Sequence, residues 1–251
     1  AGALQTSNGA YYNVAVGHEA GNDITTGIYN TLIGGLAGDA LTDADSNVAV
    51  GTSSLGADTL GSKSTAIGAS ALNAQNFTTA TDTYNTAVGY YAGVAVSTGI
   101  KNTLIGGLAG DALTDADENV AVGYNALGTN ILGSASTAIG TSALLTQNPA
   151  TAVSMYNTAV GYDAGAAVTT GIQNTIIGGL AGDAITTGGD NIAMGYLALS
   201  SDTTGQRNVA IGRAALFAQN LSGGALGYNI AVGYNAGTAV TTGTYNTLIG
   251  G

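Results

Sequence analysis

A short apolar motif recurs fourteen times along the chain, and its first copy reads NVAVG at residues 13–17. Position one is Asn in twelve copies and Ser in two, position two is Thr, Val or Ile, and position three is usually Ala. Position four is always a large apolar residue and position five is always Gly. Successive motifs begin 17 residues apart, except that every fourth step is 21, which gives a long period of 72 residues. Fixed short periods are typical of solenoids, in which each repeat packs only on its neighbours.

The motif predicts a β-strand of about five residues, because it is short and β-branched. Side chains alternate across a strand, so position four points to one face and position three to the other. Both faces are apolar, which predicts a strand buried on both sides. We expect the Gly three residues before many motifs, such as Gly27, to lie at a turn that requires positive φ, and the position-five Gly to form a corner. Each repeat, here called a coil, would then contain a strand, a Gly corner, a second short extended segment and a turn.

Two further positions follow the long period. Positions beyond the motif are numbered onward from its first residue, so that position nine of the first coil is Gly21. Position nine is Gly in the first two coils of each 72-residue super-repeat and Leu in the last two. The second coil alone has a large residue at position three, namely Leu32, Leu104, Ile176 and Leu248. Large and small side chains are thus exchanged while the total volume stays similar, as a packed interior requires. We expect the position-nine glycines to leave room that a neighbouring coil fills.

The fourth coil of each super-repeat is four residues longer than the others, with the surplus in residues 73–83, 146–154 and 218–226. All three segments contain Gln-Asn and diverge after it. Divergent insertions in a strict repeat are typical of exposed loops on a binding face. The candidate receptor contacts are Asn76, Phe77, Asn148, Pro149, Asn220 and Leu221. We expect projecting knobs at intervals of ~19 Å; the alternative is that the long coils act only as spacers.

The composition narrows the classes of partner. The net charge is −11, from fifteen acidic and four basic residues, and the scattered bases form no patch for nucleic acid. No apolar run is long enough to cross a bilayer, and no signal peptide is visible. The chain has no Cys, so it contains no disulfide. We therefore expect a protein that binds no nucleic acid and does not insert into a membrane.

The pattern predicts one solenoid domain over residues 1–251, with super-repeats that start near 13, 85, 157 and 229. Neither end has the atypical capping repeat that solenoids normally need, so we expect the chain to be part of a longer fibre. A thin solenoid with an interior of Ala, Val and Gly should be marginal alone. The second apolar face of the strand could bury against partner chains, which predicts a trimer. Stacked at ~4.8 Å, fourteen motifs would form a rod of roughly 60 Å.

The sequence contains few of the residue patterns that are typical of catalytic sites. His18 is the only histidine, and we expect it on the surface. Without Cys or a second His, zinc sites and Cys/His nucleophiles are excluded, and we predict that the chain is not an enzyme and needs no cofactor. Two acidic clusters could hold Ca²⁺ through carboxylate oxygens, and the alternative is a solvated acidic ridge. The candidate ligands are Asp39, Asp43 and Asp45, and their equivalents Asp111, Asp115 and Asp117.

Three stretches carry a family resemblance: NVAVG at 13–17, NVAVGYNAL at 119–127 and NTAVGYDAG at 157–165. They resemble the YadA-like head repeats of trimeric autotransporter adhesins, and still more the repeats of phage and bacterial tail-fibre-like proteins. The resemblance covers nearly the whole chain and depends on the fourteen-fold recurrence. It implies a left-handed parallel β-roll, three chains around one axis and a role in attachment. The coils are longer than those of the adhesin heads, and the regular 21-residue coil is a departure.

Three functions follow as hypotheses. The first is an extracellular, homotrimeric fibre segment that binds a cell-surface receptor, expected to be a glycan. It would lie on the virion surface as a phage tail fibre or, alternatively, on the bacterial surface as a trimeric adhesin head. The second is a monomeric β-solenoid that binds ice through rows of Thr. The third, an enzyme acting on polysaccharide, has the least support, because the acidic clusters repeat instead of forming one cleft.

Overall fold

The computed structural model describes residues 2–5, 9 and 11–251, and every regular element among them is a β-strand. The chain divides into two compact units, residues 1–121 and 122–251. Within each unit, successive coils form a parallel β-solenoid, which confirms the fold class that the periodicity predicts. The described part of the chain contains no helix that could span a membrane.

Each motif contributes one strand, and within a unit each strand pairs in parallel with the strand of the next coil. The motif strands of the first unit are β1 (Val14–Val16), β2 (Thr31–Ile33), β3 (Val48–Val50), β5 (Thr65–Ile67), β7 (Thr86–Val88) and β8 (Thr103–Ile105). Those of the second unit are β11 (Thr137–Ile139), β13 (Thr158–Val160), β14 (Thr175–Ile177), β15 (Ile192–Met194), β16 (Val209–Ile211), β17 (Ile230–Val232) and β18 (Thr247–Ile249). The strand β9 (Val120–Val122) spans the division between the units.

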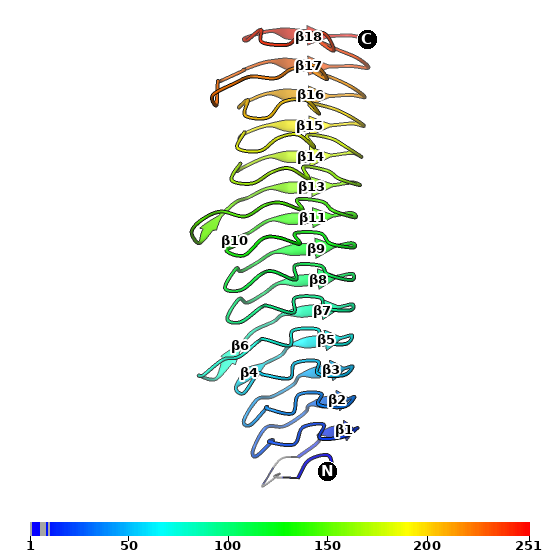
Figure 1. Ribbon diagram of the computed structural model, residues 1–251, viewed down its shortest axis with the longest axis vertical. Coiled ribbons are helices and arrows are strands. Elements are labelled where there is room, and N and C mark those ends of the chain that lie inside the picture. Colours follow the sequence, from blue (N-terminus) through cyan, green and yellow to red (C-terminus); the bar gives the residue numbers. More distant parts are fainter. Residues whose placement is uncertain (1, 6–8, 10) are drawn as a thin grey trace. The chain divides into compact units, whose positions relative to one another are not determined.

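The register joins equal motif positions, so that Thr158 lies opposite Thr175 and Ala159 opposite Ile176. Figure 1 shows the consequence in each unit: the motif strands follow one another along one side of the coils. A given motif position therefore forms a column in which each residue contacts its counterparts one coil away.

The motif strands contain three residues, so the expected length of five was wrong. At one end, the position-one N–H donates to a side chain instead of a strand carbonyl, as Asn174 N does to Asn157 Oδ1 at 3.0 Å. At the other end, the position-five Gly has φ between 127° and 143° in all fourteen copies and turns the chain out of the strand.

The two faces of the motif strand are different, which corrects the expectation of burial on both sides. Position three is fully buried inside the solenoid in most coils, for example at Ala159 and Ile176. Positions two and four point outward and are half-buried or exposed. The alternation was thus predicted correctly, but only one face packs inside the chain.

The position-five Gly is required for two separate reasons. Its positive φ favours Gly. In addition, a Cβ on Gly161 would lie 2.5 Å from the carbonyl oxygen of Gly178 in the next coil. The Gly before the motif has a different role from the one expected, since Gly27 and its equivalents are not among the residues with positive φ. A Cβ on Gly27 would instead lie 2.4 Å from the Ala44 carbonyl oxygen, so close approach of the next coil excludes a side chain there.

The exchange of volume between positions nine and three is confirmed. A Cβ on Gly93 would lie 2.6 Å from Leu104 Cδ1, and one on Gly110 would lie 2.8 Å from Leu104 Cδ2. The large position-three residue of the second coil therefore occupies the space that two glycines leave. The same arrangement recurs in the second unit, where a Cβ on Gly165 would lie 2.8 Å from Ile176 Cδ1.

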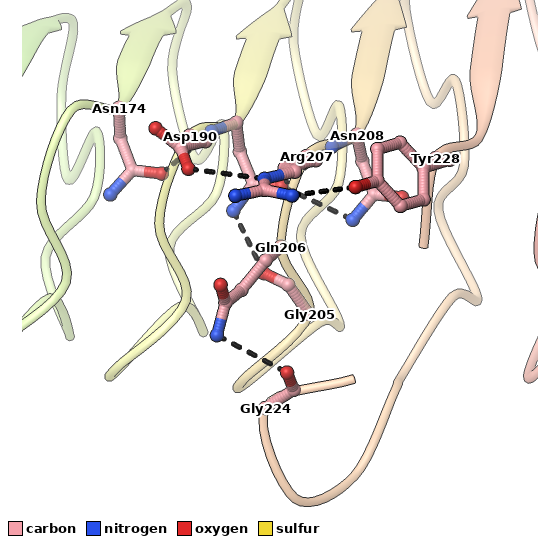
Figure 2. Close-up of polar contacts among 9 residues, drawn as sticks. Asn174, Asp190, Gly205, Gln206, Arg207, Asn208, Gly224 and Tyr228 are labelled. Carbon is pink, nitrogen blue, oxygen red and sulfur yellow. Dashed lines mark hydrogen bonds and ion pairs between the residues drawn. The ribbon is translucent and has the colours of Figure 1, made fainter. Parts of the chain in front are cut away.

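Position one forms a buried asparagine ladder inside each unit. Asn174 Nδ2 donates to the Gly188 carbonyl at 2.9 Å, and Asn174 Oδ1 accepts from the backbone N–H of Asn191 at 3.1 Å. Asn191 Nδ2 continues the ladder to the Gly205 carbonyl at 2.8 Å. Figure 2 shows Asn174, Asn208 and Gly205 of this ladder. Each Asn of the ladder thus satisfies one backbone donor and one backbone acceptor that would otherwise be buried without partners, while Ser64 and Ser136 hold position one in two of the long coils.

We predict that Asn174→Ala lowers the stability of the protein by about 2–3 kcal/mol, because it leaves the Asn191 N–H and the Gly188 carbonyl without these partners. The matched control is Asn148→Ala, at an exposed asparagine whose side chain makes no hydrogen bond to the described residues. Denaturant midpoints of the two variants measure the difference, and equal midpoints would contradict a structural role for the ladder.

Candidate functional site

The long coils are anchored by a buried polar cluster. In the first of them, Gln75 is fully buried and donates through Nε2 to Asp58 Oδ2 at 2.5 Å and to Ser64 Oγ at 2.9 Å. Gln75 Oε1 accepts from Asn85 Nδ2 at 2.8 Å, so the cluster joins the asparagine ladder. Position one of this coil is Ser64, and Gln75 extends the amide network beside its shorter side chain.

The carboxylate at the centre of this cluster is fully buried and well supplied with donors. Asp58 Oδ1 accepts from the backbone N–H groups of Gly61 at 3.0 Å and Phe77 at 3.1 Å. Together with Gln75, these donors make three hydrogen bonds, which is the condition under which a buried charge is tolerated.

The third long coil repeats the cluster with equivalent residues. Asp202 Oδ1 accepts from the N–H of Gly205 at 2.9 Å and of Leu221 at 3.1 Å, while Oδ2 accepts from Gln219 Nε2 at 2.6 Å. Gln219 Oε1 accepts from Asn229 Nδ2 at 2.7 Å. The Gln of the shared Gln-Asn pair is therefore a core residue, a role that the sequence analysis did not identify.

The middle long coil differs at two linked positions. Pro149 stands where Phe77 and Leu221 donate their N–H, and proline has no N–H. The residue equivalent to Asp58 is Asn130, whose Oδ1 accepts from Gly133 N at 2.8 Å. Gln147 Nε2 has no hydrogen-bond partner. Loss of one donor thus coincides with loss of the negative charge that the donor would have stabilised, which gives a physical reason for the divergence.

These contacts divide the six candidate receptor residues into two groups. Asn76, Asn148 and Asn220 are exposed. Three others are buried, with Phe77 7% exposed and Leu221 3% exposed, and with Pro149 also buried. The inward residues fill the base of the long coil, so a receptor contact remains a prediction for the three asparagines only.

The tips of the long coils are the exposed part, at residues 78–80, 150–152 and 222–223. Behind two of these tips lie short parallel strand pairs: β4 (Gly61–Ser62) with β6 (Thr81–Asp82), and β10 (Gly133–Ser134) with β12 (Val153–Ser154). Figure 1 shows β4, β6 and β10 on the side of the coils away from the motif strands. The third long coil has only an isolated bridge, Gln206 to Leu226. Among the described residues, the second extended segment expected in every coil is therefore formed as a strand only where a long coil pairs with the coil before it.

The candidate Ca²⁺ ligands hold the turn of the preceding coil. Asp43 accepts from the Thr26 hydroxyl, and Asp45 Oδ1 accepts from the Ile28 N–H at 2.8 Å. In the next super-repeat, Asp115 accepts from Ser97 and Thr98, and Asp117 Oδ1 accepts from the Ile100 N–H at 2.8 Å. Among the described residues, no three His, Cys, Asp or Glu side chains gather as a metal site. The clustering expected from the sequence is therefore not formed.

The acids nearest the core in these coils are Asp39 and Asp111, with Asp183 in the third super-repeat. Burial raises the pKa of all three carboxyl groups. Buried Oδ1 atoms of Asp111 and Asp183 have no hydrogen-bond partner. Hydrogen bonds from the Ser97 and Thr98 hydroxyls have the opposite effect and lower the pKa of Asp115.

The outer face of the motif strands is a repeated apolar feature. Five isoleucines at position four are between 37% and 40% exposed, among them Ile105, Ile139 and Ile211. Positions two and four hold no charged residue in any described motif strand. His18, which follows the first motif, is exposed as expected and lies 3.8 Å from Glu19.

Aromatic and charged residues border this face. The column of residues just before the motifs contains stacked rings, with the Tyr12 and Tyr29 centroids 5.2 Å apart. In the same column Arg207 Nε lies 3.4 Å from Asp190 Oδ2, and Arg207 Nη1 donates to the Tyr228 hydroxyl at 2.5 Å (Figure 2).

Comparison of the chain with protein-family models, with curated proteins and with solved structures found no match.

We predict that Asn130→Asp and Pro149→Leu are coupled. The new carboxylate needs a third donor, which the backbone N–H of the introduced leucine would supply. The double variant should therefore be more stable than the two single effects predict, by about 0.5–3 kcal/mol. Denaturant midpoints of the four proteins in the double-mutant cycle measure the coupling. Strictly additive effects would contradict the explanation given for the middle long coil.

The shifted pKa values of Asp111 and Asp115 predict how the stability of the protein depends on pH. Because the folded-state pKa of Asp111 is raised, its contribution to stability is present below its ordinary pKa of 3.8 and is lost as the pH rises through the folded value. Asp111→Asn should therefore stabilise the protein at neutral pH, by about 1 kcal/mol or less, and have no such effect in strong acid. Asp115→Asn is the control and should destabilise at neutral pH, because the Asp115 pKa is lowered. Midpoints measured across the acid range test both signs.

Proposed function

We propose that this chain is a segment of an extracellular attachment fibre that assembles as a homotrimer through the outer face of its motif strands. The observation that carries the proposal is the outward column at position four, which is Val or Ile in every motif except for Met194, beside a position two that is Val, Ile or Thr; these side chains are half-buried or exposed. Contiguous exposed apolar surface of this kind is typical of protein–protein interfaces. Absence of charge from the centre of the face agrees with the composition of interface cores.

The interior of the solenoid supports the need for partner chains. Position three is Ala in most coils, so each coil buries little apolar area on its own. Burial contributes roughly 25 cal/mol per Å² of apolar surface, and the outward Val and Ile side chains add a second set of residues whose burial would stabilise the protein. Three copies around one axis would bury one such face from each chain. The family resemblance supplies the number three and the left-handed course of the coils.

The attachment role is proposed from the resemblance and from the exposed tips of the long coils. A phage tail fibre is the first form of the proposal, and a bacterial trimeric adhesin head is the alternative. The exposed asparagines Asn76, Asn148 and Asn220, with the tips that follow them, are the proposed receptor contacts, and a cell-surface glycan is the proposed receptor. Ice binding is not favoured, because position two changes from Thr175 to Ile192 and Val209 instead of forming a Thr row.

We predict a solution mass of three times 24.3 kDa for the wild-type segment. Ile211→Lys should reduce this mass, because a charge placed on the apolar face would be desolvated in the trimer. Thr151→Lys adds the same charge at an exposed long-coil tip and should leave the mass unchanged. Sedimentation measures all three proteins; a monomeric wild type at micromolar concentration would contradict the assembly.

The attachment role is tested separately, with labelled protein applied to bacterial cells and to animal cells. Labelling of bacteria supports the tail fibre, and labelling of animal cells supports the adhesin. A variant with the three tips shortened, but with Gln75, Gln147 and Gln219 kept in place, should remain folded and label more weakly. Equal labelling by a folded tip variant would make the long coils spacers.

A further inference from the structure

A second column of aromatic residues lies just after the motifs, at position six. In the second unit, it contains a tyrosine on every second coil, in the order Tyr124, Thr141, Tyr162, Gly179, Tyr196, Arg213 and Tyr234. Backbone hydrogen bonds align the column, since each position-six carbonyl accepts from the position-seven N–H of the next coil, as in Leu180 N to Tyr162 O at 2.9 Å. The four tyrosines are between 48% and 60% exposed.

One gap in this column is filled by a cation from the chain itself. Arg213 Cζ lies 5.8 Å from the centre of the Tyr196 ring and 5.3 Å from that of Tyr234, and Nη1 donates to the Tyr234 hydroxyl at 3.0 Å. A planar guanidinium between two aromatic rings is a favourable cation–π arrangement. The space between tyrosines two coils apart therefore suits a guanidinium group.

The preceding gap has the same two-coil spacing, ~9.6 Å, but no side chain between its tyrosines. It is bounded by Tyr162 and Tyr196, and its middle residue is Gly179. A side chain is sterically allowed at Gly179, because a Cβ there would make only ordinary van der Waals contact, at 3.7 Å from Cδ2 of the Tyr196 ring. Gly179 is not among the residues with positive φ, so the backbone does not require glycine.

A carboxylate beside Tyr162 favours a cationic occupant of this gap. A hydrogen bond to Asp163 is the main cause of the raised pKa of the Tyr162 hydroxyl, so this carboxylate lies at the edge of the gap. The charge of Asp163 also adds to the effect of burial in raising the pKa of Asp183, which places the two acids within electrostatic range. Asp183 Oδ1 is buried without a hydrogen-bond partner.

The lysines and arginines of this chain are poor sources of the cation. The chain has four Lys and Arg residues. Three of them form ion pairs, Lys63 with Asp82, Lys101 with Glu118 and Arg207 with Asp190, and Arg213 lies between its two tyrosines. A second copy of this chain therefore has no uncommitted cation to offer, whereas its net charge of −11 attracts a basic partner.

We propose that Tyr162, Gly179 and Tyr196 form a slot for the guanidinium of an arginine on a partner protein, with Asp163 balancing its charge. The slot is a partner contact distinct from the long-coil tips, and it does not depend on the trimer. Arginine fits better than lysine, because the guanidinium is planar and can contact both rings, and Arg213 lies between two tyrosines in the next gap.

Filling the slot from within the chain tests its geometry. Gly179→Arg should raise the denaturation midpoint, because the new guanidinium would lie between two tyrosines. Gly35→Arg is the matched control, since Gly35 occupies the same position in the first super-repeat and also has open space, but its neighbours in the column are His18 and Thr52. An equal change in midpoint for both variants would overturn the slot.

Binding is tested with a blocked tripeptide that contains a central arginine, titrated against full-length wild-type protein by NMR of the tyrosine ring signals. We expect saturable shifts at Tyr162 and Tyr196, at least tenfold weaker binding of the matching citrulline tripeptide, and loss of binding in Gly179→Arg. Tyr162→Leu should weaken binding at least tenfold, while Tyr124→Leu should not. Equal binding of the citrulline peptide, or no saturable shift, would overturn the proposal. A changed solution mass in Tyr162→Leu would also overturn it, because that tyrosine would then belong to a subunit interface.

Discussion

The close contact between backbones of successive coils is the constraint on which the rest of the structure depends. At position five the chain turns with a φ that favours Gly, and the next coil approaches so closely that a Cβ on Gly161 would overlap the Gly178 carbonyl. A solenoid of this kind has no freedom to separate its coils locally, because each coil is hydrogen-bonded on both sides. The invariant Gly therefore sets the spacing at which every other column has to pack.

Close stacking also explains why the interior is partly polar. Backbone groups at the edge of each short strand face the interior, where water is absent, and buried groups without partners are costly. The asparagine ladder satisfies them at each level, and at the long coils Gln75 and Gln219 extend it to a buried aspartate. The apolar interior is correspondingly thin, with Ala at most position-three sites. Order inside the coils thus comes from matched hydrogen bonds as much as from apolar burial.

The sequence predicted the features that depend on period and side-chain volume. The 17-residue spacing, the inward position three and the exchange of volume between Gly110 and Leu104 all follow from residues that can be compared copy by copy. The buried role of Gln75 and Phe77 could not be predicted, because a four-residue insertion is typical of a loop and gives no sign of which side chains turn inward. One signal was available, since the Gln of Gln-Asn is shared by all three long coils while the following residue diverges.

The same stacking rule governs where charge is placed. Equal positions lie one coil apart, about 4.8 Å, so a column of identical charges would repel at every step, as like charges do on neighbouring strands. The chain avoids this in two ways. Charged residues are few, at 8% of the sequence, and several of those on the surface alternate in sign or stack on tyrosine. Asp190, Arg207 and Tyr228 follow one another in one column, and Lys101 faces Glu118 in the coil above it. Positions whose neighbours are uncharged can repeat without repulsion, so position four of the motif is apolar in every coil and position two is Val, Ile or Thr. The continuous apolar face is therefore the one surface that strict repetition favours, and the variation that distinguishes one coil from another is confined to the columns beside it and to the tips of the long coils.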